Sequence, residues 1–375
     1  MIYIHIPFCK QACHYCDFHF STSMKYKEEM LDSLLKEIDL RVEYLQDKTI
    51  HSIYFGGGTP SLLESAEINK IIDHIAKHYE IKSDAEITLE ANPDDLTKQK
   101  VNQLKTTTIN RFSIGIQSFF QEDLLWMNRA HNDQEARSSI MRVQDAGFEN
   151  ITCDLIYGFP LLSDVKWTAN MQSLIDLEVP HISSYAMTVE KQTALDHLIK
   201  KGKTPALDEQ QSAHQMLMLL DKLTTAGYEQ YEISNFAKPG KIAKHNSNYW
   251  KGQHYLGLGP SAHSYNGYSR SWNIPNNAQY LELIQQKELP LETENLSLSD
   301  QYNEYVMTGL RTKWGIDLQT IQNKFGSDTR KELLTNVDPY LNNNDVILSD
   351  KQVITLSQTG KLLADQIASA LFIVD

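Results

Sequence analysis

Three of the four cysteines in this 375-residue chain lie together near its start. Cys9, Cys13 and Cys16 have the spacing CxxxCxxC within the segment HIPFCKQACHYCDF. A 4Fe–4S cluster bound only by cysteine uses four thiolates, so three thiolates leave one iron open to a small molecule. Zinc and a disulfide are the alternatives, but a second pair of zinc ligands is missing and a disulfide strands one thiol. The pattern therefore favours a 4Fe–4S cluster.

Other residues suited to bind a ligand lie along predicted strands. Strand patterns cover 2–6, 52–55, 86–89, 111–116, 151–156 and 182–186, and helical patterns cover 25–44, 66–78, a segment from 97, 133–145, a segment from 164, and 209–225. This alternation predicts parallel strands with helical crossovers. The polar and glycine clusters lie at or just after the ends of consecutive strands, except that Asp154 lies within one: Gly56, Gly57, Gly58, Thr59, Glu90, Asn92, Gln117, Asp154, Tyr185 and Thr188. Because they come from many strands, we predict a (β/α) barrel with its site at the C-terminal face, rather than a doubly wound sheet.

The composition limits the partners of the chain. It has 48 acidic and 35 basic residues and a net charge of -13, which disfavours nucleic acid and broad adhesion to anionic lipid. No apolar run is long enough to span a membrane. The start, MIYIHIPFCK, lacks the features of a secretory signal. Clustered reduced thiols without an export signal predict a cytoplasmic protein.

The cysteine motif and the aromatic residues after it resemble the radical S-adenosylmethionine (SAM) superfamily. In that superfamily the amino and carboxylate groups of SAM chelate the fourth iron, and the reduced cluster cleaves SAM to a 5′-deoxyadenosyl radical. The resemblance implies an α/β fold, a partial, TIM-like (β/α)6 barrel open on one side. It also implies contacts with SAM by ten residues: Tyr3, Tyr15, Gly57, Gly58, Thr59, Glu90, Gln117, Arg129, Asp154 and Thr188.

Several of these residues also have plain structural interpretations. The GGGTP segment resembles the one that holds the amino group of SAM, but it could be a tight turn. Glu90, in the segment LEANP, suits a ribose hydroxyl, because a buried acid needs a partner. Arg129 suits a carboxylate or a salt bridge, and Asp154 could cap a backbone group. Cys153 is expected to be an inert core residue.

The segments IHIPFC and FGGGTPS narrow the resemblance to the branch of oxygen-independent coproporphyrinogen III oxidase. That branch holds a decarboxylase and a haem chaperone. The decarboxylase motif continues to a further cysteine, where this chain has Phe18. The decarboxylase also carries an N-terminal extension, for which the eight residues before Cys9 leave no room.

His245 begins the segment HNSNYW, whose pattern HNxxYW resembles the haem chaperones. An imidazole can ligate haem iron, and Tyr249 and Trp250 could lie against a porphyrin. The alternative is a hydrogen-bonded core histidine beside two packing aromatics. Because the segment follows the last barrel helix, we expect it to be separate from the cysteine loop. Four other histidines are further candidates for binding haem: His5, His14, His19 and His263.

A different pattern begins near residue 296. Helical patterns at 301–310, 318–324 and 330–340 precede a hairpin of 346–348 and 353–356, and a helix at 360–371 follows. Helices with a two-stranded wing resemble the winged-helix-like α+β domain that ends this family, although the acidic chain disfavours DNA. The last helix has an apolar face of Leu362, Leu363, Ile367 and Leu371, expected to pack on the domain, with peripheral membrane association as the minor alternative.

These patterns predict three domains: a radical SAM core barrel over 1–235, a connecting segment over 236–295 that carries HNxxYW, and a C-terminal domain over 296–375. The resemblance implies a haem chaperone that binds haem and a SAM-coordinated 4Fe–4S cluster. Its partner would be an acceptor protein, such as a respiratory haemoprotein. The alternative is an oxygen-independent coproporphyrinogen III dehydrogenase, and tRNA modification is disfavoured by the charge.

Overall fold

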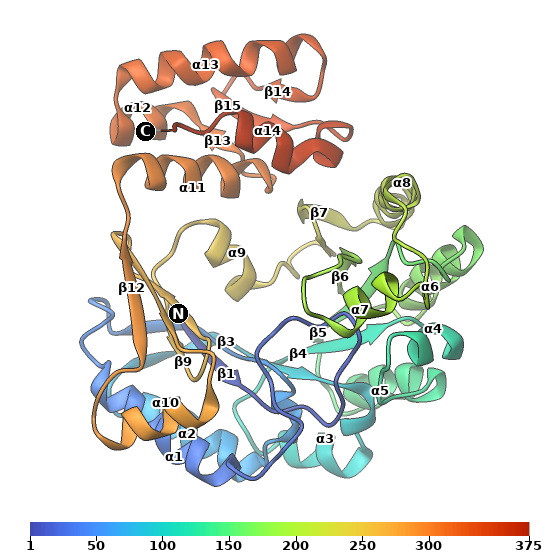
Figure 1. The fold of residues 1–375 in the computed structure, drawn as a ribbon, viewed down its shortest axis with the longest axis vertical. Coiled ribbons are helices and arrows are strands. Elements are labelled where there is room, and N and C mark those ends of the chain that lie inside the picture. The colour runs from blue at the N-terminus through green and yellow to red at the C-terminus, as the bar shows by residue number, and fades with distance from the viewer. Residues whose placement is uncertain (375) are drawn as a thin grey trace.

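A computed structural model describes residues 1–374. Nine strands form one sheet in the order β7-β8-β6-β5-β4-β3-β2-β1-β9. Its six central strands pair in parallel, and they are β1 (Ile2–Ile6), β2 (Thr49–Gly57), β3 (Glu80–Ala91), β4 (Arg111–Gln117), β5 (Asn150–Tyr157) and β6 (His181–Ala186). The edge strands β7 and β9 are not neighbours, so the barrel is partial, as predicted (Figure 1).

Helices connect the parallel strands. The six predicted ones are α1 (Lys27–Leu40), α2 (Ser65–Ala76), α3 (Lys98–Leu104), α5 (Asp133–Asp145), α6 (Asp164–Asp176) and α8 (Glu209–Thr225). Two further helices, α4 (Gln121–Trp126) and α7 (Ala194–Lys200), were not predicted, because fewer than two turns show no helical period. Short 3₁₀ turns, η1 (Pro60–Leu62) and η2 (Pro93–Asp95), follow β2 and β3.

Strand alternation sets which side chains face the barrel interior. Ile2, Ile4 and Ile6 of β1 are fully buried in the main core. Tyr3 and His5 alternate with them and so lie on the other face. The register pairs Tyr3 with Tyr54 and His5 with Gly56 of β2. The polar face of β1 therefore adjoins the glycine segment at the end of β2.

The predicted connecting segment contributes strands to both edges of the barrel sheet. After β7 (Glu229–Glu232), β8 (Asn235–Ala237) pairs with β6, whereas β9 (Leu256–Leu258) pairs with β1. Between them lies α9 (Lys244–Trp250), which contains the HNxxYW motif. A three-stranded sheet of β10 (His263–Tyr265), β11 (Ser269–Asn273) and β12 (Leu291–Asn295), together with α10 (Asn277–Gln285), completes the segment. None of these elements was predicted, because strands of three to five residues and helices of seven and nine residues show little periodic pattern.

The C-terminal unit has a core of its own. Its elements are α11 (Leu298–Leu310), β13 (Ile316–Asp317), α12 (Leu318–Phe325), α13 (Ser327–Asn342), β14 (Val346–Leu348), β15 (Val353–Leu356), η3 (Gly360–Leu363) and α14 (Ala364–Ala370). This is a winged-helix-like order, with an antiparallel sheet β13-β15-β14. Figure 1 shows the unit as an orange-to-red layer beyond the barrel, reached through β12.

The last helix has only part of the predicted apolar face. Ile367 and Leu371 are buried in the C-terminal core, whereas Leu363 is 40% exposed. The expected continuous helix is wrong for its first turn: residues 360–363 form a 3₁₀ turn, which rotates Leu363 out of the α-helical stripe. No helix in the described part of the chain is long and apolar enough to cross a membrane.

Candidate functional site

The cysteine loop follows β1 at the C-terminal rim of the barrel. Cys9, Cys13 and Cys16 are half-buried, and all four cysteines of the described chain are free. The loop is tied to itself, because the Cys9 amide donates to the Ser21 carbonyl at 3.0 Å and the Cys16 amide donates to the Cys13 carbonyl at 3.3 Å. The three thiols are thus available together and are not consumed by a disulfide.

The two helices that the sequence did not predict hold this loop in place. The His14 amide donates to the Met127 carbonyl at 3.1 Å, and the His14 ring binds the Trp126 carbonyl through Nδ1 at 2.8 Å. These partners end α4. At the start of α7, the Leu195 amide donates to the His14 carbonyl at 2.7 Å. His14 is therefore a structural anchor of the loop.

Hydrogen-bond donors approach two of the sulfurs. Thr59 Oγ1 donates to Cys9 Sγ, and Arg129 Nη1 donates to Cys13 Sγ, both at 3.4 Å. Burial raises the pKa of Cys16 to about 12 and also raises that of Cys9. Metal binding requires thiolates, so it would release protons here. The donors offset part of that cost by stabilising negative sulfur.

Backbone packing explains the glycine segment after β2. The Gly58 and Thr59 amides donate to the carbonyls of Ile6 and Phe8, at 2.9 and 2.7 Å. A Cβ at Gly58 would lie 2.5 Å from the Phe8 carbonyl oxygen. Gly57 has a φ of +108°, and a Cβ there would lie 2.6 Å from the His5 ring. Only glycine fits this close approach, which joins the segment to the cysteine loop.

Two carboxyl groups lie in the barrel interior. Glu90 accepts hydrogen bonds from the Tyr54 hydroxyl at 2.7 Å and from the Gly57 amide at 3.2 Å. Burial, together with the nearby Asp154, raises the pKa of Glu90 to about 7, although the hydrogen bond from Tyr54 lowers it. Burial likewise raises the pKa of Asp154 to about 7, against a hydrogen bond from Ser183. Both groups are set to accept hydrogen bonds from a ligand.

Arg129 joins the third strand end to the cysteine loop. Its Nη2 donates to Asn92 Oδ1 at 2.7 Å and to the Gly115 carbonyl at 2.9 Å. Its Nη1 also reaches the Tyr15 hydroxyl at 3.4 Å. Its buried Nε has no hydrogen-bond partner among the described residues. This cation is therefore fixed beside the thiols with one donor unused.

The remaining SAM candidates differ in how deeply they are buried. Tyr3 stacks on Tyr54, with ring centroids 6.1 Å apart, and its hydroxyl lies 3.2 Å from His5 Nδ1. Gln117 is buried at the end of β4 with a φ of +63°. Thr188 is exposed beyond β6, and no hydrogen bond joins it to the other candidates within residues 1–374. The structure thus brings Tyr3 into the group and leaves Thr188 at its margin.

Tyr54 is the interior residue that sequence reasoning missed. It contacts Tyr3, donates to Glu90, and lies against the His245 ring at a centroid distance of 5.1 Å. The available signal was its position two residues before Gly56, which places both on the same face of the strand.

His245 has the structural role given above as the alternative. It is 1% exposed, and burial lowers its pKa to about 3. Its Nδ1 lies 2.9 Å from Ser52 Oγ, and its Nε2 lies 3.1 Å from the hydroxyl of Tyr249, one turn along the same helix. Ligating iron would break one of these contacts. Tyr54 connects His245 to Glu90, so the histidine adjoins one of the SAM candidates.

The other candidate histidines differ in availability. His5 binds the Tyr3 hydroxyl and the His19 carbonyl, the latter at 2.9 Å, and His19 binds Asn277 at 2.7 Å. His263 is exposed and stacks on Trp272, with ring centroids 5.9 Å apart. No hydrogen bond occupies its ring within the described chain. His263 therefore has the most accessible imidazole of the five candidates.

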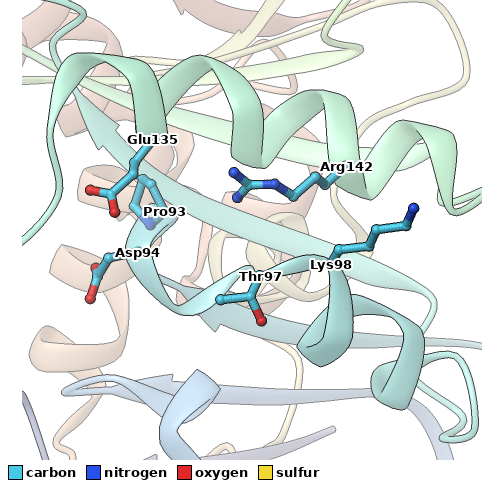
Figure 2. A pocket seen from close by; sticks show the side chains of 6 residues that line it. All are labelled: Pro93, Asp94, Thr97, Lys98, Glu135 and Arg142. Atoms are coloured by element: carbon cyan, nitrogen blue, oxygen red, sulfur yellow. The ribbon is translucent and has the colours of Figure 1, made fainter.

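The pocket drawn in Figure 2 lies between α5 and the turn that follows β3. It is lined by Pro93, Asp94, Thr97, Lys98, Glu135 and Arg142. Arg142, on α5, donates to the Leu96 carbonyl at 2.9 Å and to Ser138 Oγ at 2.8 Å. The pocket contains none of the cysteines or SAM candidates. Its side chains brace the turn that follows Asn92.

The chain is similar to other proteins over nearly its whole length. A protein named Heme chaperone HemW from Bacillus subtilis (strain 168) is 33% identical over 371 residues, covering 98% of each chain. The chain belongs to the HemW family. Its relatives of the same name include proteins from Lactococcus lactis, 30% identical over 97% of this chain and 95% of theirs, and from Escherichia coli (strain K12), 35% identical over 70% and 69%.

Two profiles and one solved structure agree with this assignment. The Radical SAM superfamily profile matches residues 3–172, and the HemN C-terminal domain profile matches 296–363. The structure of coproporphyrinogen III oxidase (HemN) from Escherichia coli has a TM-score of 0.86 and 23% identity, over 99% of this chain and 89% of that one. The likeness to HemN shows a common fold. The radical SAM assignment implies a 4Fe–4S cluster and SAM.

The three thiols of the cysteine loop do not converge on one point as the ligands of a single metal ion would. Thiolates around one tetrahedral zinc lie about 3.8 Å apart. Within residues 1–374, one group of three metal-type ligands has all its atoms within 4.8 Å of one another, and it is Asp39, His74 and His78 rather than the cysteines. The three sulfurs are thus spread more widely than one ion requires. A cubane binds each thiolate through a different iron, so it does not need that convergence.

Proposed function

We propose that this protein is a haem chaperone that carries a 4Fe–4S cluster with SAM and passes haem to an acceptor such as a respiratory haemoprotein. The likeness to the Bacillus subtilis protein named Heme chaperone HemW, over 98% of both chains, carries this proposal. Phe18 supports it. Its side chain is 68% exposed and offers no thiol where the decarboxylase has its further cysteine.

We assign the cluster to Cys9, Cys13 and Cys16. A bound cluster would supply an iron with an open coordination position. Thr59 and Arg129 would donate hydrogen bonds to the ligating sulfurs from their present positions. Arg129 would also attract the carboxylate of SAM, since its guanidinium is buried at the same place.

The interior carboxyl groups would orient the rest of SAM. Glu90 and Asp154 can accept hydrogen bonds from ribose hydroxyls, which would replace the water lost on burial. Their raised pKa values support this assignment, because each group gains more from a new hydrogen-bond donor while it is poorly solvated. Tyr3 and Tyr54 offer aromatic surface beside Glu90.

We place haem recognition at His263 rather than His245. The His263 imidazole is exposed and stacks on Trp272. An exposed neutral imidazole can ligate iron without loss of a protein hydrogen bond, whereas His245 would lose a contact with Ser52 or Tyr249. The Trp272 ring would provide apolar surface for the porphyrin edge.

The decisive experiment gives the protein haem in one sample and coproporphyrinogen in another. Purified, cluster-reconstituted protein is titrated with haem and followed at the Soret band. In a parallel sample it receives coproporphyrinogen, SAM and a reductant, and protoporphyrinogen is measured. Haem binding and transfer to an apo-haemoprotein without turnover supports the chaperone. Turnover to protoporphyrinogen would instead establish the dehydrogenase, which the fold of HemN keeps as the second candidate.

A further inference from the structure

A second group of metal-type ligands lies where α1 packs against α2. Asp39 is near the end of α1, His74 is in the last turn of α2, and His78 follows that turn. The Nε2 atoms of His74 and His78 lie 2.8 and 2.7 Å from the same Asp39 oxygen, Oδ1. All three ligand atoms lie within 4.8 Å of one another. Helices of a (β/α) barrel end at the face opposite the strand ends, so this group is distant from the cysteine loop.

Ordinary ion pairs along the same two helices provide a comparison. Lys27 pairs with Glu67 at 2.6 Å, and Lys70 pairs with Asp32 at 2.9 Å. Each of these acids meets one ammonium group. At Asp39 two imidazoles, one from the last turn of α2 and one from the turn that follows it, converge on a single oxygen. A single imidazole would be enough to pair with the Asp39 carboxylate. The second imidazole on the same oxygen therefore indicates a role other than simple pairing.

We propose that Asp39, His74 and His78 bind a divalent first-row cation of the zinc class. Neutral imidazole and carboxylate are established ligands for such ions. Around a tetrahedral zinc the ligand nitrogens and oxygen would be about 3.4 Å apart, so the present contacts would widen by about 0.6 Å. The Asp39 side chain is 52% exposed and can rotate to allow this. Solvent reaches the same point, and water would complete the coordination. The bound ion would clamp α1 to α2.

Lys77 provides a way to distinguish a metal site from a purely structural contact. Its Nζ lies 3.4 Å from His74 Nδ1. With that nitrogen accepting from lysine, the ring proton lies on Nε2, where it bonds Asp39. Metal binding at Nε2 moves the proton to Nδ1 and ends the lysine contact. Removing the lysine ammonium should therefore strengthen metal binding while leaving the three ligands intact.

The test measures zinc on cluster-loaded protein, in which the cysteines are already occupied. Equilibrium dialysis against Zn²⁺, with zinc, iron and sulfide determined per chain, should show one zinc in the parent. His74→Ala and His78→Ala should each weaken zinc binding about tenfold or more, since even outer partners of a metal site contribute that much. Asp39→Asn, which retains an oxygen acceptor for the histidines, should also weaken it. Lys77→Ala should strengthen it.

The matched control is His214→Ala, which removes an exposed histidine from a single pair with Asp164 at 3.3 Å. It should retain the zinc of the parent. Zinc should also raise the melting temperature of the parent and of His214→Ala, but not that of His74→Ala. Equal zinc binding by the parent and both His→Ala ligand variants, or no zinc on the parent, would overturn the proposal. Iron and sulfide contents show that each variant is folded around its cluster.

Discussion

Replacing Gly57 by alanine should destabilise the protein more than the same replacement at Gly147. Both glycines have a left-handed φ, +108° and +90°, so each alanine meets a similar backbone penalty of about 1–2 kcal/mol. A Cβ at Gly147 would meet nothing within 4 Å, whereas one at Gly57 would lie 2.6 Å from the His5 ring. That ring is held by Tyr3 and by the His19 carbonyl. The overlap should add about 1–3 kcal/mol.

The assay is urea-induced unfolding of both variants without a cluster, followed by circular dichroism, and then iron and sulfide analysis after reconstitution. Gly57→Ala should lose about 2–5 kcal/mol in total and should bind less iron, because the displaced His5 ring contacts the cysteine loop at His19. Gly147→Ala should keep the iron content of the parent. Equal free energies of unfolding for the two variants would show that the glycine segment is not closely packed against β1, and our explanation of GGGTP would be wrong.

Three further predictions concern single residues of the site. Alanine at any one of the three clustered cysteines should abolish a stable 4Fe–4S cluster, whereas Cys153→Ala, in the apolar core, should retain full iron and sulfide; equal iron loss in Cys153→Ala would refute the ligand assignment. The pKa of Glu90 is raised to about 7 by burial, so the folded state favours the protonated carboxyl. The contribution of Glu90 to the free energy of unfolding is therefore fully present below about pH 4.5 and is lost as the pH rises through 7. Relative to the parent, Glu90→Gln should therefore gain stability between pH 5 and pH 8 in thermal melts of cluster-free protein, by about 3 kcal/mol at most; a pH-independent difference would contradict this. His263→Ala should weaken haem binding and change the Soret spectrum with the cluster intact, whereas His245→Ala should mainly lower stability; the reverse result would return the haem site to HNxxYW.

The local patterns of the chain predicted the strands and helices of the barrel. Each predicted strand from Ile2–Ile6 to Ile182–Ala186 lies within an observed strand, and the helices at 133–145 and 209–225 have the predicted bounds. Buried parallel strands are short apolar runs, and amphipathic helices repeat every 3.6 residues, so both appear in the sequence itself. The cysteine spacing and the glycine segment are equally local, because both lie in loops directly after strands.

The tertiary structure decided which distant residues meet. Arg129 reaches Cys13 from 116 positions away, and His245 reaches Ser52 from 193 positions away. No pattern in either segment encodes those contacts, since they depend on how the strands pair and curve. For the same reason the segment after residue 235 was predicted as a connection, although β8 and β9 extend opposite edges of the sheet. The sequence thus determined most elements of the barrel and the residue types proposed as ligands, and packing determined which of their nitrogen, sulfur and oxygen atoms have no partner within the described chain.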